Sequence, residues 1–180
     1  MTTLPTSLAA RRPVTPEART VLTADPEFTR FVLAEQHRLL RMAHLICGDP
    51  VLAEDLVQDA LIKLADRWES VDHPKSFVRQ VISRDAISWW RRWRREALTD
   101  SLPEPPGRSG PDHAEALALR AALAQLPARQ RTAVVLRYFE DLTEAQTAEV
   151  MGVRVGTIKS LCHTAMKALR TQLTDKEQIP

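Results

Sequence analysis

The sequence predicts an all-α protein, built from two small helical domains of which the second contains a helix-turn-helix. Two long blocks carry apolar residues at three- and four-residue spacing, and no stretch shows the period-two alternation of a strand. Between the blocks, six of the 12 proline and 5 glycine residues fall within Pro103–Pro111. Proline lacks a backbone N–H and restricts the residue before it, so this stretch predicts a linker. We therefore expect a disordered tail (1–25), a first domain (26–98), a linker (99–111), a second domain (112–174) and a short tail (175–180).

The first domain should contain three helices, near residues 27–47, 50–68 and 75–97. Gly48-Asp49-Pro50 fits the end of one helix followed by the start of the next. Glycine is favoured just after the last residue of a helix, and proline is favoured in the first turn of a helix. His73-Pro74 repeats the boundary signal before the third helix.

The second domain should contain four helices, near 112–125, 128–139, 143–150 and 154–173. Thr143 with Gln146 matches a capping box, and Gly152 permits a sharp turn about one short helix later. The last helix then places an apolar stripe inward and leaves a polar, basic face outward. This pattern predicts a helix-turn-helix with a recognition helix suited to the major groove, in preference to an ordinary helical hairpin.

Composition excludes several classes of protein. The chain has 180 residues, 44% of them hydrophobic, which is enough to bury a core and excludes a fully disordered chain. Two cysteines exclude a disulfide scaffold, and no apolar run approaches the roughly 18 residues of a membrane span. The N-terminus lacks the apolar segment of a secretory signal. We expect a cytoplasmic protein.

An enzyme is not expected. No zinc-protease, nucleophile-elbow or phosphate-loop motif is present, and the five histidines are scattered. His37, His44 and Cys47 could share one helix face as a metal or redox cluster, but three such residues without a fourth ligand are more often core or rim residues. We expect no catalytic residue, metal or cofactor, and interpret Cys47 and Cys162 as buried thiols.

The formal net charge of +2 conceals a segregation of charge along the chain. Residues 79–96 carry six arginines against two acids, residues 49–72 carry seven acids against two bases, and residues 154–170 carry four bases and no acid. Basic helices suit phosphate contacts, which supply most non-specific affinity for nucleic acids. Two basic helices in different domains favour that interpretation over a merely solvated surface.

The basic segment at residues 79–96 is also rich in tryptophan. Three of the four tryptophans lie in the run Trp89-Trp90-Arg91-Arg92-Trp93. Tryptophans beside arginines suit unstacked bases, because the rings stack on bases while the guanidinium groups hold phosphates. Packing between helices is the alternative. We favour it for Trp90 and leave both roles open for Trp89 and Trp93.

An acidic face precedes this basic helix. Asp55, Gln58 and Asp59 lie together opposite the apolar residues of the second predicted helix. An acidic surface should not meet DNA, so it suggests docking on a basic protein surface. A plain solvated face is the alternative.

At these residues the chain resembles a known family. AEDLVQDALIKL at 53–64, the Arg/Trp helix, and LPARQRTAVVLRYFEDLTEAQTAEVMGVRVGTIKSLCHTAMKALR at 126–170 are similar to group 4 (extracytoplasmic function, ECF) sigma factors of bacterial RNA polymerase, especially actinobacterial ones. The resemblance extends over about residues 28–173 and has two motif sets in the right order.

The resemblance implies that residues 28–98 dock on the clamp helices of the largest polymerase subunit and open the −10 element, and that residues 112–173 read the −35 element. It also implies contact with the flap of the second-largest subunit. An anti-sigma factor is a further partner that the sequence leaves open. By the resemblance, the polymerase-docking residues are Asp55, Gln58 and Asp59; the −10 residues are Lys75, Arg79, Arg84, Ser88, Trp89, Arg91, Arg92, Trp93 and Arg95; and the −35 residues are Arg154, Thr157, Lys159, Ser160, His163 and Lys167.

Four positions depart from the family pattern. Arg84 stands where asparagine is usual and Ser88 where aspartate is common. Arg154 replaces a frequent helix-capping serine, and His163 a frequent arginine. An arginine cannot accept the helix N–H bonds as serine does, but it could contact a phosphate.

Two other functions compete with a sigma factor as interpretations of the sequence. One is a plain helix-turn-helix regulator whose first domain senses a signal or dimerises. The other is a helical partner-binding module without a DNA role.

Overall fold

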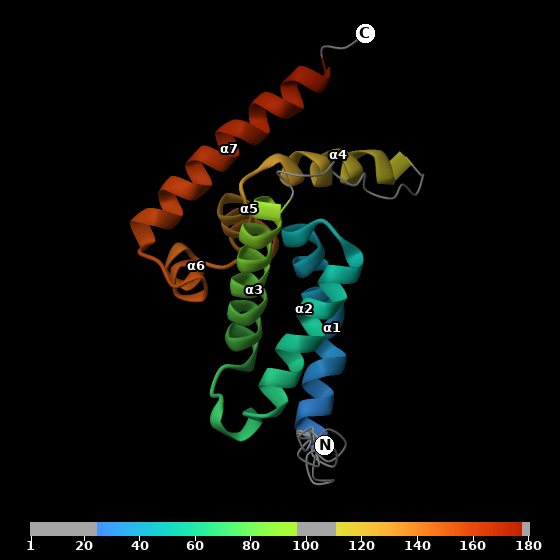
Figure 1. Cartoon of the computed structure of the whole chain (residues 1–180), viewed down its shortest axis with the longest axis vertical. Helices are drawn as coiled ribbons and strands as arrows, with labels where there is room; N and C mark the ends of the chain where they lie inside the picture. The colour runs from blue at the N-terminus through green and yellow to red at the C-terminus, as the bar shows by residue number, and fades with distance from the viewer. Residues whose placement is uncertain (1–24, 97–110, 178–180) are drawn as a thin grey trace, which may run out of the picture.

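The computed structural model describes residues 25–96 and 111–177, and every element in these ranges is helical (Figure 1). The predicted all-α fold is confirmed. The elements are α1 (Pro26–Cys47), α2 (Pro50–Ala65), the 3₁₀ turn η3 (Trp68–Ser70), α3 (Pro74–Glu96), α4 (Pro111–Gln125), α5 (Ala128–Val134), the π-helical turn η4 (Val135–Phe139), α6 (Glu144–Met151) and α7 (Val155–Glu177).

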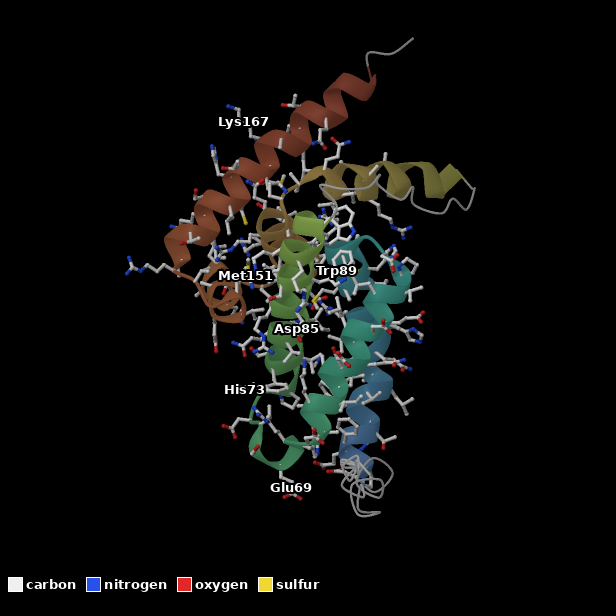
Figure 2. The ribbon with its side chains drawn as sticks, in the orientation of Figure 1. Glu69, His73, Asp85, Trp89, Met151 and Lys167 are labelled. Atoms are coloured by element: carbon white, nitrogen blue, oxygen red, sulfur yellow. The ribbon has the colours of Figure 1, made fainter. Side chains whose placement is uncertain are left out.

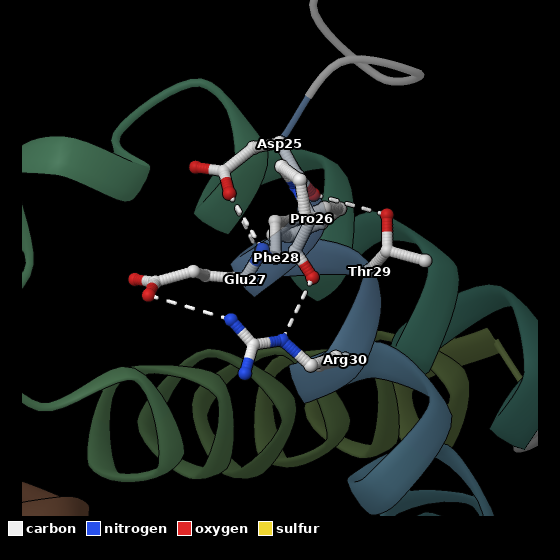
Figure 3. A network of polar contacts seen from close by, with 6 residues as sticks. All are labelled: Asp25, Pro26, Glu27, Phe28, Thr29 and Arg30. Carbon is white, nitrogen blue, oxygen red and sulfur yellow. Dashed lines mark hydrogen bonds and ion pairs between the residues drawn. The ribbon is translucent and has the colours of Figure 1, made fainter.

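The helix starts in the first domain follow from side-chain caps. The Asp25 carboxylate accepts hydrogen bonds from the backbone N–H groups of Glu27 (2.7 Å) and Phe28 (3.3 Å), so it satisfies donors that the first turn leaves free (Figure 3). Asp49 does the same for Leu52 at 2.7 Å. Gly48 ends α1 with φ 81°, in the left-handed region that glycine adopts without a steric penalty. The predicted Gly-Asp-Pro boundary is confirmed.

Several predicted boundaries were wrong by a few residues. The second helix ends at Ala65, and η3 follows it as a separate turn. Pro111, placed in the linker, begins α4, because proline fits the first turn of a helix. The last helix continues to Glu177, into the expected C-terminal tail. Asp25, placed in the N-terminal tail, caps α1. Residues 1–24, 97–110 and 178–180 lie outside the described residues.

The two domains pack against each other and share a core. The larger cluster of buried apolar residues joins α1, α2 and α3 to Val135, Leu136, Leu142 and Val150 of the second domain. A second cluster unites α4, α5 and α7 through Ala122, Leu123, Leu126, Val134, Ala165 and Leu169. The sequence predicts two domains with apolar helix faces but does not predict that the domains pack against each other. Periodicity identifies which face of a helix is apolar, but it does not identify the element that packs against that face.

Helix α3 occupies the centre of this arrangement. It contacts α1 and α2 on one side and α5 and α6 of the second domain on the other, while α7 lies at the outer edge (Figure 1). The basic helix predicted to read DNA is therefore also the helix against which the second domain packs. Within the described residues, no helix is long and apolar enough to cross a membrane.

Candidate nucleic-acid interface

The predicted helix-turn-helix is formed by α6 and α7. The Thr143 hydroxyl accepts a hydrogen bond from the Gln146 N–H at 3.2 Å, and the Thr143 N–H donates to the Gln146 side chain at 2.8 Å, which completes the capping box. Gly152 takes φ 62° and turns the chain between the two helices. Ile158 and Ala165 of α7 are fully buried, so the rotation of α7 about its axis is fixed by its apolar stripe.

That rotation points the polar face of α7 away from the body of the protein. All six residues predicted to contact the −35 element are exposed, and Lys167 projects from the outer side of α7 (Figure 2). Lys159 makes one ion pair, at 3.7 Å to Glu144 of α6. The carbonyl oxygen of Arg154 accepts hydrogen bonds from the N–H groups of Thr157 (2.9 Å) and Ile158 (3.3 Å), and the Arg154 side chain is exposed.

A hollow of about 680 Å³ beside this face contains residues that the sequence analysis missed. Arg137 and Tyr138 of η4 line it together with Lys159, Ser160 and His163 of α7. The Tyr138 ring is well exposed, and the Arg137 guanidinium lies 5.8 Å from its centroid. The sequence shows that Arg137 and Tyr138 are neighbours, but nothing there indicates that the tyrosine is exposed or that η4 lies beside the recognition helix.

On α3 several of the predicted −10 residues already have intramolecular partners. Lys75 forms an ion pair with Glu35 of α1 at 2.5 Å. Arg91 and Arg92, by contrast, are exposed. Arg84 pairs with its neighbour Asp85 at 3.1 Å. The side chain of Arg95 lies outside what the structure describes.

The Asp85 carboxylate is shared by two cations. Besides Arg84, Lys63 of α2 donates to it at 2.8 Å. Burial by itself would raise the pKa of Asp85, but the hydrogen bonds from Lys63 and Arg84 outweigh it and hold the pKa below its ordinary value. Asp85 therefore stays charged at neutral pH and fastens α3 to α2.

Arg79 is the clearest difference between the predicted site and the structure. Its side chain is only 13% exposed, and its Nε donates to the carboxylate of Glu140 in the second domain at 2.7 Å. Arg38 of α1 binds the same carboxylate at 3.0 Å. The Glu140 side chain is fully buried, so the group Arg38–Glu140–Arg79 joins the two domains through a buried carboxylate that pairs with two arginines.

The geometry of η4 explains how Glu140 reaches the first domain. The Glu140 N–H bonds to the carbonyl of Val135, five residues earlier, which widens the helix by one residue at this turn. Asp141 then takes φ 55°, and the chain changes direction towards α6. Neither the π turn nor the left-handed residue has a signal in the sequence, so Glu140 could not be singled out there.

Arg131 is a second buried contact between the domains. It is 2% exposed, and it donates to the carbonyls of Ile46 in α1 (3.0 Å) and of Ala124 (2.6 Å) and Leu126 (3.1 Å) in its own domain. Its guanidinium lies 4.8 Å from the centroid of the Trp90 ring. The sequence analysis did not single out Arg131, because its neighbours Gln130 and Thr132 are polar and give no signal of a buried cation.

The three tryptophans of α3 form one cluster. Trp89 and Trp93 are stacked, with an interplanar angle of 12° and centroids 6.0 Å apart, and Trp90 lies edge-on to both. Trp90 packs under Arg131, in line with the packing role favoured for it. Trp89 and Trp93 are half-buried, so each keeps exposed surface in this structure.

The acidic face lies beside this cluster. Asp55, Gln58 and Asp59 are exposed on α2, as the helical pattern predicted. Asp55 and Asp59 line a hollow of about 370 Å³ together with Trp89 and Arg92 of α3. The predicted polymerase-docking surface and the predicted −10 surface therefore adjoin along α2 and α3.

Among the described residues, the cysteines and histidines do not gather into a metal site. No group of three potential metal ligands occurs among the described residues, so the His37, His44 and Cys47 cluster is not assembled there. Burial raises the pKa of the Cys47 thiol to about 11, which keeps it protonated at neutral pH. Burial also lowers the pKa of His44. Cys162 is half-buried, so the expectation of two buried thiols was right only for Cys47.

Comparison with known proteins matches both halves of the molecule. The model of sigma-70 region 2 matches residues 31–96 and that of sigma-70 region 4 matches residues 116–169. RNA polymerase sigma-E factor of Streptomyces coelicolor is 36% identical over 156 residues, covering 84% of this chain and 88% of the relative. The ECF RNA polymerase sigma factor SigL of Mycobacterium tuberculosis is 31% identical over 147 residues, covering 76% of this chain and 83% of the relative. The chain belongs to the extracytoplasmic function sigma factors.

Solved structures agree with this assignment. The sigma factor RpoE of Bartonella quintana, determined with the anti-sigma factor NepR, is 25% identical with a TM-score of 0.69, covering 83% of this chain and 98% of that one. CnrH, determined with the cytosolic domain of CnrY, has a TM-score of 0.64 at 15% identity, covering 88% of this chain and 95% of that one, and supports the fold alone. The sigma factor functions in transcription initiation.

Proposed function

We propose that this sigma factor binds core RNA polymerase through the acidic face of α2, captures the −10 element with α3 and reads the −35 element with α7. The observation that carries the proposal is the placement of the three surfaces. Asp55 and Asp59 are exposed beside Trp89, and Gln58 is exposed on the same helix. The polar residues of α7 are exposed on a different helix, at the outer edge of the molecule (Figure 1). One chain can therefore meet polymerase and two DNA segments with different faces.

Charge supports this division of labour. The acidic helix suits a basic protein surface, and the two basic helices suit phosphates. The near-neutral total of +2 limits the attraction of the free chain to DNA, so promoter contact depends on polymerase placing both domains. The RpoE relative is in complex with an anti-sigma factor, and we propose a protein of that kind as a further partner.

Arg154→Ala and Lys159→Ala should each weaken binding of the polymerase holoenzyme to a −35 duplex. Both side chains are exposed at the start of α7, where a recognition helix approaches DNA. A lost phosphate contact should reduce the slope of log K against log salt by about 0.9 on every sequence, whereas a lost base contact should relax specificity at one position. Fluorescence anisotropy over a salt series measures both.

The matched control is Arg67→Ala, which removes one exposed positive charge from the first domain. It should leave binding to a duplex that carries only the −35 element unchanged. If the slope and the specificity of both α7 variants equal those of the control, α7 does not face DNA and the −35 assignment is wrong.

A further inference from the structure

A cleft of about 480 Å³ lies between α3 and the second domain. Its volume is in the range of roughly 300–1,000 Å³ that is typical of small-molecule sites. Met151 at the end of α6 is seen beside α3 on this side of the molecule (Figure 2). The residues that line the cleft are Ser83, Arg84, Ile87, Ser88 and Arg91 of α3, Arg129 of α5, and Val150 and Met151 of α6.

Three of these residues are arginines, and no acidic residue lines the cleft. Arg84 and Arg91 lie two turns apart on α3, so they share a face, and Arg129 approaches from the other domain. All three are exposed to solvent, and for Arg91 and Arg129 the described part of the chain supplies no ion pair. Arg84 already pairs with Asp85 at 3.1 Å. Packing of the domains therefore brings Arg129 to the side of Arg91, and an anion between these two arginines would neutralise their charges.

A buried hydroxyl gives a second, independent indication of a ligand. Ser83 is fully buried and lines the cleft, and its Oγ has no hydrogen-bond partner among the described residues. A buried polar group without a partner costs free energy, so native proteins rarely retain one. A ligand oxygen in the cleft would supply the missing bond.

Apart from Ser88, the remaining lining residues are apolar. They are Ile87 of α3 and Val150 and Met151 of α6. A simple inorganic anion would leave this surface unused, whereas the flat ring of a nucleobase could pack on it. Arginines suit the other part of such a ligand, because the planar guanidinium binds phosphate oxygens in a bidentate manner.

We propose that the cleft binds a nucleoside polyphosphate, with its phosphates on Arg84, Arg91 and Arg129 and its base against Ile87, Val150 and Met151. The ligand bridges the two domains, so it stabilises their packed arrangement. The ligand also contacts Arg84 and Arg91, which are assigned above to the −10 element. It therefore competes with −10 DNA for these two arginines. The site itself does not depend on the proposed function, because it is built from the packed chain without polymerase or promoter.

The test is isothermal titration of the full chain with ATP, with pyrophosphate and with a thymidine hexanucleotide as probes. ATP should bind with a dissociation constant below about 1 mM and more tightly than pyrophosphate. Arg129→Ala should weaken ATP binding by about tenfold, as expected for the loss of one phosphate contact. The matched control, Arg30→Ala, removes an exposed arginine of α1 and should leave it unchanged.

A second variant tests whether ATP binding requires the assembled cleft or only the individual exposed arginines. Glu140→Lys should separate the domains by opposing Arg38 and Arg79, and it should abolish ATP binding although all three cleft arginines remain. Five results would overturn the proposal. They are no ATP binding by the wild type, unchanged ATP binding by Arg129→Ala, unchanged ATP binding by Glu140→Lys, pyrophosphate binding as tight as ATP binding, and a loss in Arg129→Ala that affects the thymidine hexanucleotide but not ATP. None of these measurements involves polymerase, so they leave the proposed function untouched.

Discussion

Glu140→Ala should reduce the free energy of unfolding by about 3 kcal/mol. The Glu140 carboxylate is fully buried and receives Arg79 at 2.7 Å and Arg38 at 3.0 Å from the first domain. Removing one partner of a buried ion pair leaves the other charge desolvated without compensation, and Arg79 is only 13% exposed. Arg38 is 44% exposed and can return to water, so most of the loss should come from Arg79.

Urea denaturation followed by tryptophan fluorescence measures this loss, and the tryptophan cluster lies close to the contact between the domains. Glu149→Ala is the control, since it removes an exposed acid from α6 in the same domain and should change stability by less than about 0.5 kcal/mol. The double variant with Arg79→Ala should be less destabilised than the sum of the single variants, because both remove the same pair. Equal stabilities for Glu140→Ala and the control would show that the domains are not held by this contact.

Asp55→Lys combined with Asp59→Lys should reduce affinity for core RNA polymerase by about 100-fold or more, since like charges would then meet at the docking surface. Both side chains are exposed on α2, so the folded structure should be retained. Co-purification with core polymerase and anisotropy of the labelled chain measure the loss.

The matched control is Glu69→Lys combined with Asp72→Lys. It reverses the same amount of charge at two exposed positions at the far end of the first domain, where Glu69 is seen well away from Trp89 (Figure 2). The control should retain binding. Wild-type affinity in the α2 variant, or an equal loss in both variants, would contradict a docking role for this acidic face.

Much of the architecture could be predicted because its determinants are local. Gly48, the capping box at Thr143 and the turn at Gly152 act through their own backbone neighbours, so the pattern of residue types is sufficient. The exposure of Asp55 and Lys159 follows from helical periodicity in the same way.

The contact between the domains could not be predicted, because it depends on residues far apart in sequence. Glu140 and Arg79 are 61 positions apart, and Arg131 binds a carbonyl 85 positions away. The π turn that directs Glu140 has no sequence signal. As a result Arg79, expected on an open DNA-binding face, lies between the domains.

The central claim is that the chain directs transcription by core RNA polymerase from a promoter. Run-off transcription with purified core polymerase, on templates selected from a random library by the reconstituted holoenzyme, tests it most directly. The account predicts discrete transcripts that require the chain and disappear with the Asp55→Lys, Asp59→Lys variant. No transcript above that of core polymerase alone, on any selected template, would contradict it.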